Sequence, residues 1–275
     1  MGSRDTPYAN QKIRKTIGAL SLQLCAQIQT MPRNKMNTCL ITSAVSPNID
    51  MPNSRKSERL AQTIDAIAKI QHTNLFERIF CIDGTDFDLT PHLQNLSSRN
   101  SQIICRAFRQ DAASVQRFGY GYGETEIYQY FCANFSGSFT NVYKISGRYN
   151  LKNLPEIIQI ARRYRNFYFT YYPRFIQYRR YIHTAFFKTE VKDLEAYSRR
   201  ASLYLIANKG RPLEEAMYEA IQEDPVKMHW LIAPAPQYEG ISGNSGRNLS
   251  DFRLPYSLTR KLSFLPCMAF SAEKV

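Results

Sequence analysis

The sequence predicts an α/β fold in which helices flank a twisted, mostly parallel sheet, with helical and loop additions toward the C-terminus. Short apolar runs alternate with segments of helical periodicity, an order typical of parallel sheets whose two faces are both covered. Polar or charged residues follow each apolar run, and the carboxyl ends of parallel strands meet at one edge, where α/β proteins bind ligands. A chain of 275 residues can bury the core of such a domain.

Four strands and two helices carry this prediction in the first half of the chain. In both helices the apolar residues recur every three or four positions, which places them on one buried face. The strand ends bring Thr42, Ser43, Asp83 and the sequence Ser146-Gly147-Arg148 to the same edge of the sheet. The strands are expected at Asn37–Ala44, Arg78–Ile82, Gln102–Arg106 and Val142–Ile145, and the helices at about Lys56–Ile70 and Glu124–Asn134.

Glycine alternates with tyrosine just before the second of these helices, at Gly119, Gly121 and Gly123. A glycine-rich loop, a helix and a strand that ends in polar and basic residues follow one another here, as they do around ligand sites of open α/β sheets. The segment from Gly119 to Leu151 is therefore predicted to form the centre of the site.

Basic and aromatic residues interleave from Ala161 to Phe187. Such a run can stack bases and contact phosphates. However, Phe167, Phe169 and Tyr171 alternate as in a strand, so a sheet core with a basic outer face is the preferred interpretation. None of the usual RNA-binding signatures is present, and nucleic acid is not the predicted partner.

Two further helices are expected, at about Glu190–Ala207 and Leu213–Asp224. Glu214 shares a helix face with Met217 and Ile221, so its carboxylate is expected to point inward. Burial of this kind raises the pKa of a carboxyl group, as general bases require, although a capping contact with a basic neighbour would also explain it. The glycine- and serine-rich segment from Gly240 to Arg247 can present several backbone N–H groups to an anion.

The predicted organisation is a basic N-terminal extension followed by one domain. A helix is expected at about Asn10–Gln29 within residues 1–36, and its apolar stripe can dock on the domain or rest on a membrane surface; a loosely ordered segment is the third alternative. Within 37–275, a nucleotide-binding part covers about 37–150, an acceptor-side part covers about 151–250, and a tail covers 251–275.

Charge and composition limit the classes of partner. The formal net charge is +13, which attracts polyanions such as nucleotides or anionic lipid. The six cysteines and four histidines show no metal-binding spacing, and no apolar run is long enough for a transmembrane helix. A soluble, cytoplasmic protein is therefore predicted. Peripheral contact with the inner face of the membrane is also predicted, because the positive net charge attracts anionic lipid.

Several short motifs follow one another along the chain. In order, they are Thr42-Ser43-Ala44, Arg59, Asp83, Gly121-Tyr122-Gly123-Glu124, Lys144–Tyr149, Thr184–Phe187, Glu214 and Gly240–Gly246. Together these motifs resemble the GT-A-fold bacterial and viral glycosyltransferases that build surface polysaccharides from nucleotide sugars. The resemblance covers about residues 37–247, and Lys-Ile-Ser-Gly-Arg-Tyr is its most specific part.

This resemblance implies a Rossmann-like GT-A domain that moves a sugar from a nucleoside-diphosphate sugar, such as a UDP-sugar, to a hydroxyl of a glycan or lipid-linked saccharide. Thr42, Ser43 and Asp83 would hold the nucleoside, with Asp83 accepting from the base or ribose, while a turn-forming role is the alternative for Asp83. Lys144 and Arg148 would face the diphosphate. The rest of the implied nucleotide-sugar site is Arg59, Gly121, Ser146, Gly147, Ser245 and Arg247.

Glu214 is the expected general base for an inverting transfer, and Glu124 is the second candidate, with support of the phosphate site as its alternative role. The sequence departs from the family where an Asp-x-Asp commonly holds a divalent metal, because Ser146-Gly147-Arg148 stands there. Fixed cations can stabilise the leaving diphosphate instead, so no cofactor is predicted to be required. Asp86 and Asp88 are the alternative ligands for Mg²⁺ or Mn²⁺.

Two other functions stay open at this point. The charge and the basic-aromatic run would also fit a protein that binds nucleic acid or another polyanion. A different nucleotide-sugar or nucleotidyl enzyme would fit the same α/β plan, and its products would separate it from a glycosyltransferase.

Overall fold

A computed structural model describes residues 37–47, 53–96, 101–171, 181–224, 228–232, 234, 236–240 and 266–271. The predicted extension 1–36 with its helix, and the segment with Ser245 and Arg247, lie outside this part of the chain. The division of the chain at residue 36 therefore stays a prediction. No helix in the described ranges is both long and apolar enough to cross a membrane.

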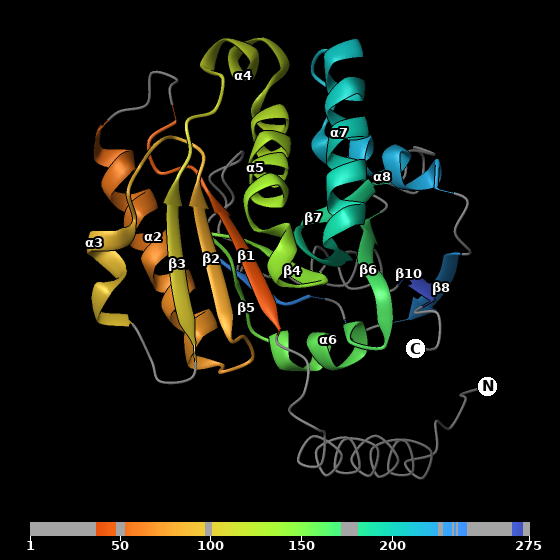
Figure 1. Cartoon of the computed structure of the whole chain (residues 1–275), viewed down its shortest axis with the longest axis horizontal. Helices are drawn as coiled ribbons and strands as arrows, with labels where there is room; N and C mark the ends of the chain where they lie inside the picture. The colour runs from red at the N-terminus through yellow and green to blue at the C-terminus, as the bar shows by residue number, and fades with distance from the viewer. Residues whose placement is uncertain are drawn as a thin grey trace, which may run out of the picture. The chain divides into compact units, whose positions relative to one another are not determined.

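The central sheet has eight strands in the order β3-β2-β1-β4-β7-β6-β10-β8 (Figure 1). Its first four strands are parallel to one another. From β4 onward, every neighbouring pair is antiparallel. The strands are β1 Thr38–Ser43, β2 Arg78–Asp83, β3 Gln102–Ala107, β4 Asn141–Ser146, β6 Tyr164–Tyr171, β7 Tyr181–Glu190, β8 Met228–Ile232 and β10 Pro266–Ser271; β5 Asn150–Leu151 and β9 Tyr238–Glu239 form a separate antiparallel pair.

Helices cover both faces of the sheet, so the predicted α/β class is confirmed. One core lies between the sheet and α2, α3 and α6, and the other lies between the sheet and α5, α7 and α8. In β4, Tyr143 and Ile145 belong to the first core, whereas Val142 belongs to the second, as strand alternation requires. The helices are α2 Asn53–His72, α3 Thr90–Leu93, α4 Ala112–Phe118, α5 Tyr120–Phe135, α6 Leu154–Ala161, α7 Val191–Ala207 and α8 Leu213–Gln222.

The glycine-rich stretch differs from the prediction. Helix α5 begins at Tyr120 rather than at Glu124, so Gly121 and Gly123 lie inside the helix and form no loop. Gly119 precedes the helix with a φ of 95°, a conformation that favours glycine. A Cβ atom at Gly121 would lie 2.9 Å from the Cβ atom of Leu213, so this glycine lets α5 approach the first turn of α8.

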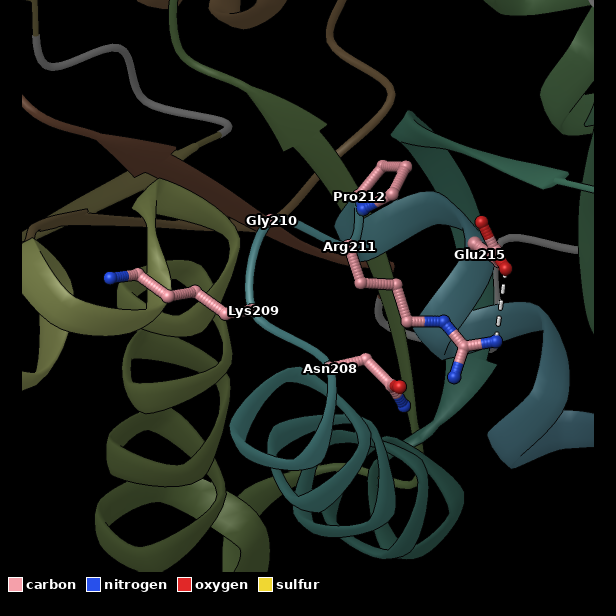
Figure 2. Close-up of a pocket in the computed structure, with 6 residues that line it drawn as sticks. All are labelled: Asn208, Lys209, Gly210, Arg211, Pro212 and Glu215. Carbon is pink, nitrogen blue, oxygen red and sulfur yellow. Dashed lines mark hydrogen bonds and ion pairs between the residues drawn. The ribbon is translucent and has the colours of Figure 1, made fainter.

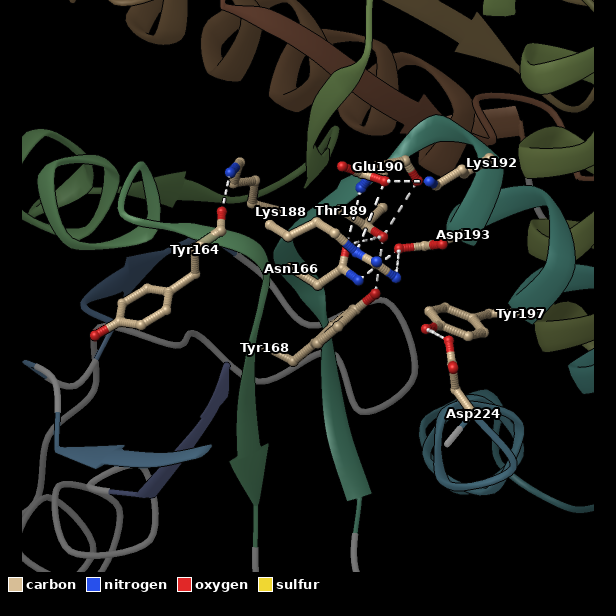
Figure 3. A network of polar contacts seen from close by, with 11 residues as sticks. Tyr164, Asn166, Tyr168, Lys188, Thr189, Glu190, Lys192, Asp193, Tyr197 and Asp224 are labelled. Atoms are coloured by element: carbon tan, nitrogen blue, oxygen red, sulfur yellow. Dashed lines mark hydrogen bonds and ion pairs between the residues drawn. The ribbon is translucent and has the colours of Figure 1, made fainter. Parts of the chain in front are cut away.

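The strands formed by the basic-aromatic run contribute buried aromatic residues to the sheet core, whereas Arg162 and Arg163, just before β6, are exposed. Phe167, Tyr168 and Phe169 on β6 are fully buried. At the junction of β6, β7 and α7, the Asn166 side-chain amide donates to Asp193 at 2.6 Å, and Thr189 donates to the Asn166 Oδ1 atom at 2.9 Å (Figure 3). This network satisfies buried polar groups and fixes the start of α7 against the sheet.

Candidate functional site

The site lies at the carboxyl edge of the sheet, between β1 and β4. From β1 the chain proceeds through α2 to β2 on one side, whereas β4 lies on the other side, so the strand order reverses between β1 and β4. Such a switch point is where open α/β sheets bind ligands. The Gly147 N–H donates to the Thr42 carbonyl oxygen at 2.8 Å, and a Cβ atom at Gly147 would lie 2.9 Å from that oxygen. Glycine at this position therefore allows the two strand ends to meet.

Lys144 is the centre of a buried polar cluster on the side of α5 and α8. Its side chain is 0% exposed, and its ammonium nitrogen lies 2.5 Å from Glu124 Oε1. The same group donates to Ser146 Oγ at 2.8 Å and to the Thr184 carbonyl oxygen. These three contacts match the three donors of an ammonium group. Lys144 was predicted to face a diphosphate, but the structure directs it to Glu124 instead.

Glu124 receives three contacts at one carboxylate oxygen. Besides Lys144, Thr42 Oγ1 donates to Oε1 at 3.1 Å and the Tyr128 hydroxyl donates at 2.9 Å. Burial alone would raise the pKa of Glu124, but the Lys144 charge and the hydrogen bonds to Oε1 outweigh it and hold this pKa below its usual value. The side chain is 25% exposed, so the ionised group remains accessible at the edge of the sheet.

Glu214 stands in the first turn of α8 and belongs to the same cluster. Thr184 Oγ1 donates to Glu214 Oε1 at 3.1 Å, while the Thr184 carbonyl oxygen accepts from Lys144. Burial raises the pKa of Glu214, and the negative charge of Glu124 raises it further. The site thus contains two carboxyl groups whose pKa values are shifted in opposite directions. Such pairs are found where acid–base chemistry is performed.

Asp83 occupies the end of β2 and is fully buried. Its Oδ2 accepts from Ser43 Oγ at 2.6 Å and from the Val45 N–H at 2.9 Å. Its Oδ1 accepts from the Thr85 N–H at 2.8 Å and from the Thr85 hydroxyl at 2.5 Å. In this structure Asp83 therefore fixes the loops that follow β1 and β2, in agreement with its turn-forming alternative. These contacts occupy the carboxylate that was predicted to accept from a nucleoside.

Arg59 and Arg148 bring two positive charges to the switch point on the side of the sheet that α2 covers, opposite the Lys144 cluster. Both side chains are half-buried, and α2, which carries Arg59, contacts β5 two residues after Arg148. Burial lowers the pKa of Arg59, and the nearby charge of Arg148 lowers it further. Gly240, at φ 121°, packs against the Arg148 backbone so closely that a Cβ atom would overlap the carbonyl oxygen. Two neighbouring guanidinium groups in a partly buried site favour an anion between them.

The alternative metal ligands have other partners. Arg109 contacts Asp86 with two nitrogen atoms, at 3.0 and 2.7 Å. Asp88 Oδ1 accepts from the Thr90 N–H at 2.8 Å near the start of α3. Within the described ranges, no three His, Cys, Asp or Glu side chains are grouped so that they could hold a metal ion. Asp86 and Asp88 thus bind different protein groups, Arg109 and the Thr90 N–H respectively.

A pocket of about 290 Å³ lies beside the connection between α7 and α8 (Figure 2). Its lining includes Arg211, whose guanidinium contacts Glu215 at 3.0 Å and also contacts Glu219. Glu214, the residue before Glu215, turns instead to Thr184. The adjacent carboxylates of Glu214 and Glu215 therefore bind different groups, Thr184 and Arg211 respectively.

The structure adds Tyr128 and Thr184 to the residues predicted from the sequence. Tyr128 lies one helical turn after Glu124, and this i, i+4 spacing could have identified it as a partner of that carboxylate. Thr184 stands in the quoted Thr-Ala-Phe-Phe motif, but its two contacts depend on the pairing of β4 with β7. No local pattern in the sequence indicates that pairing.

Comparison with known proteins identifies no family for this chain, so any proposal about its function depends on the geometry of the site. No protein-family model and no curated protein matches the sequence. Among solved structures, the crystal structure of HddC from Yersinia pseudotuberculosis is similar over 58% of this chain and 79% of that chain, with 9% sequence identity and a TM-score of 0.38. A likeness of this size supports no conclusion about function.

Proposed function

We propose that the protein is a glycosyltransferase that moves a sugar from a nucleoside-diphosphate sugar to a hydroxyl group of a glycan or a lipid-linked saccharide. The observation that carries the proposal is the pair Glu124 and Glu214, whose pKa values are shifted in opposite directions beside Lys144. The resemblance of the motifs to GT-A glycosyltransferases supports it, as does the position of the pair at the switch point of the sheet.

In the proposed reaction, Glu214 is the general base. Its raised pKa makes it a stronger base than an exposed glutamate, and Thr184 orients the carboxylate through Oε1. As the acceptor oxygen forms a bond to the anomeric carbon, its proton passes to Glu214. The bond between the anomeric carbon and the diphosphate breaks, and the nucleoside diphosphate leaves with the bonding electron pair. An in-line displacement of this kind inverts the anomeric configuration.

Glu124 has a different proposed role. Its lowered pKa keeps it ionised, and its three contacts all meet at Oε1. Among the described residues, none donates to Glu124 Oε2. We assign this second oxygen to accept a hydrogen bond from a sugar hydroxyl at the edge of the sheet. Lys144 then acts as a positioning residue, since it fixes Glu124 and the Thr184 carbonyl together.

Arg59 and Arg148 are proposed to hold the diphosphate. A leaving diphosphate gains negative charge in the transition state, and two fixed guanidinium groups stabilise that charge by charge-assisted hydrogen bonds. Because fixed cations can stabilise the diphosphate without a metal, metal-independent transfer remains the prediction, with Mg²⁺ or Mn²⁺ as the alternative. Arg247 stays a further candidate from the sequence alone.

The first experiment is a thermal-shift panel of nucleoside diphosphates and their sugars, each with EDTA and with Mn²⁺. A ligand that binds the native state raises the melting temperature. We expect one nucleotide class to do so in EDTA, and we expect the double variant Arg59→Gln/Arg148→Gln to lose the shift. A shift that requires Mn²⁺ would contradict the metal-independent mechanism. No shift with any nucleotide would contradict the glycosyltransferase proposal and favour polyanion binding.

The second experiment tests the base in a transfer assay with the donor so identified. Glu214→Gln is expected to lower kcat by about 10²- to 10⁴-fold, the range of general acid–base catalysis, with donor binding retained. Glu215→Gln is the matched control, because Glu215 stands next to it but contacts Arg211. Near-wild-type transfer by Glu214→Gln would remove Glu214 from the mechanism. Cleavage or synthesis of the nucleotide anhydride without an acceptor would indicate a nucleotidyl enzyme instead.

A further inference from the structure

Two thiols lie opposite each other at the outer edge of the sheet. In the parallel pairing of β2 with β3, Cys81 is the direct partner of Cys105. Their side chains point to the same face of the sheet, since Cys81 belongs to the first core and Cys105 packs against that core. Neighbouring strands are about 4.8 Å apart, and disulfides join residues whose Cα atoms are about 4.4–6.8 Å apart. The strands therefore hold these two free thiols at a separation that a disulfide can bridge.

Cys39 and Cys132 cannot replace either member of this pair. Cys39 on β1 pairs with Ile79, so it is offset by two residues from Cys81 along the sheet. This offset adds about 6.6 Å along the strand to the spacing between strands, and the resulting Cα separation of about 8 Å is too long for a disulfide. Cys132 belongs to the second core, on the other face of the sheet. Among the four cysteines whose side chains the structure describes, only Cys81 and Cys105 can therefore be joined.

The two thiols differ in their access to solvent. Cys81 is fully buried, whereas Cys105 is half-buried on β3, the outermost strand of the described sheet (Figure 1). A thiol enclosed in a core behaves as a small apolar group, but a partly exposed thiol whose anion is stabilised is reactive. Hydrogen bonds from Cys81 and from Thr90, at the start of α3, lower the pKa of Cys105. Burial and the negative charge of Asp88 oppose this shift without cancelling it. A small oxidant therefore meets Cys105 first, with the Cys81 thiol beside it.

We propose that Cys81 and Cys105 form a site of reversible oxidation, in which hydrogen peroxide converts the two thiols into a disulfide. The Cys105 thiolate attacks one oxygen of the peroxide, the O–O bond breaks, and a sulfenic acid forms on Cys105 as hydroxide leaves. The Cys81 sulfur then attacks the Cys105 sulfur, and the sulfenic hydroxyl group leaves with the bonding electron pair. The Cys81 proton joins this hydroxyl group to give water, while the first hydroxide takes up the proton that Cys105 released on ionisation. In total the two thiols lose two electrons and two protons, and one peroxide becomes two molecules of water.

The test maps the bond in the full chain under native conditions, and it is independent of the proposed sugar transfer. The reduced protein is treated with hydrogen peroxide, the remaining thiols are blocked with iodoacetamide after unfolding, and the unreduced chain is digested with trypsin. Trypsin separates the two thiols, because Arg99 ends peptide 79–99 and the next peptide is 100–106. We expect mass spectrometry to find these two peptides joined by a disulfide in the monomeric protein, and we expect dithiothreitol to separate them.

Variants at three cysteines distinguish the roles of the two thiols. Cys105→Ser is expected to lose the disulfide and to leave Cys81 unoxidised, since the peroxide enters at Cys105. Cys81→Ala is expected to hold Cys105 as the sulfenic acid, which dimedone then labels more strongly than in the wild type. Cys39→Ala is the matched control, because it removes a thiol from the same core on the adjacent strand, and it should form the disulfide as fully as the wild type. Circular dichroism checks that each variant is folded.

Four results would overturn the proposal. The first is wild-type protein in which peptides 79–99 and 100–106 stay separate after oxidation, and the second is a disulfide through Cys39 formed to the same extent. The third is a disulfide that joins two copies of the chain, seen as a dimer on a non-reducing gel. The fourth is a melting temperature that falls on oxidation, because the bond would then form only when β2 and β3 separate.

Discussion

Replacement of Lys144 by methionine tests the arrangement of the buried cluster most directly. The side chain is 0% exposed and contacts Glu124 at 2.5 Å, so Lys144→Met keeps most of the volume but leaves a carboxylate without its cation. Removing one partner of a buried ion pair costs about 3–5 kcal/mol in the free energy of unfolding. Because Glu124 is 25% exposed and retains Thr42 and Tyr128 as donors, we expect the lower end, about 3 kcal/mol.

This loss is large enough to measure by thermal or urea unfolding. In a chain of this size, 1 kcal/mol shifts the melting temperature by about 2–4 °C, so Lys144→Met should melt about 6–12 °C below the wild type at neutral pH. Lys69→Met is the control, since Lys69 contacts Asp65 at 2.7 Å but both side chains are exposed. An exposed pair contributes less than about 1 kcal/mol, so the control should melt within about 4 °C of the wild type.

The pH dependence follows from the direction of the Glu124 shift. In the wild type the pKa of Glu124 is lowered, so its contribution to stability is present above the unfolded pKa and is lost as pH falls through the folded pKa. Without Lys144, burial dominates and raises the pKa of Glu124 above its usual value. The variant is then destabilised at neutral pH and recovers on acidification, once the carboxyl group is protonated. The difference in melting temperature should therefore narrow from about pH 8 to about pH 5.

A double-mutant cycle gives the result that would refute this reasoning. Lys144→Met/Glu124→Gln replaces both charges, and the glutamine oxygen can still accept from Thr42 and Tyr128. The double variant should therefore be more stable than Lys144→Met alone. If it is no more stable, or if the destabilisation of Lys144→Met is the same at both pH values, the two groups do not form the ion pair described.

Further predictions concern packing, loop anchoring and thiol chemistry. Gly121→Ala should destabilise the protein by about 1–3 kcal/mol in urea unfolding, because the new Cβ atom meets Leu213 at 2.9 Å; Gly137→Ala, with no atom within 4 Å, should stay within about 1 kcal/mol of the wild type. Asp83→Asn should cost about 2 kcal/mol or more, because an amide nitrogen cannot accept the hydrogen bonds made to that oxygen, whereas Asp88→Asn on the surface should have a small effect, and equal melting temperatures of the two variants would contradict the anchoring role. Among Cys39, Cys81, Cys105 and Cys132, Cys105 should react first with iodoacetamide in peptide mapping, since a hydrogen bond from Cys81 holds the pKa of its thiol below the usual value, while burial raises the pKa of Cys132 to about 12. Faster labelling of Cys132 than of Cys105 would contradict this order.

Much of the local structure could be predicted because it is determined by patterns along the chain. The strand that begins at Arg78 and the helix that ends at Ala207 agree with the structure within a few residues. The prediction for the glycine-rich stretch was wrong, since glycine has a low helix propensity and reads as a loop in sequence. Glycine is present inside α5 because a Cβ atom at Gly121 would meet Leu213 of α8, and one at Gly123 would meet the side chain of Gln110, which lies before α4.

The same distinction applies to the candidate site. The sequence by itself determined the α/β class, the delivery of polar residues to one edge of the sheet and the inward direction of Glu214, because periodicity and strand ends are local properties. Only the tertiary structure decided that Lys144 pairs with Glu124, that Asp83 anchors loops, and that Thr184 links Lys144 to Glu214. These partners are 20 to 40 residues apart, and the charge that each side chain meets depends on which strands and helices become neighbours. That environment sets the pKa of a buried carboxyl group. Whether the pKa is raised or lowered therefore depends on the fold rather than on the residue type.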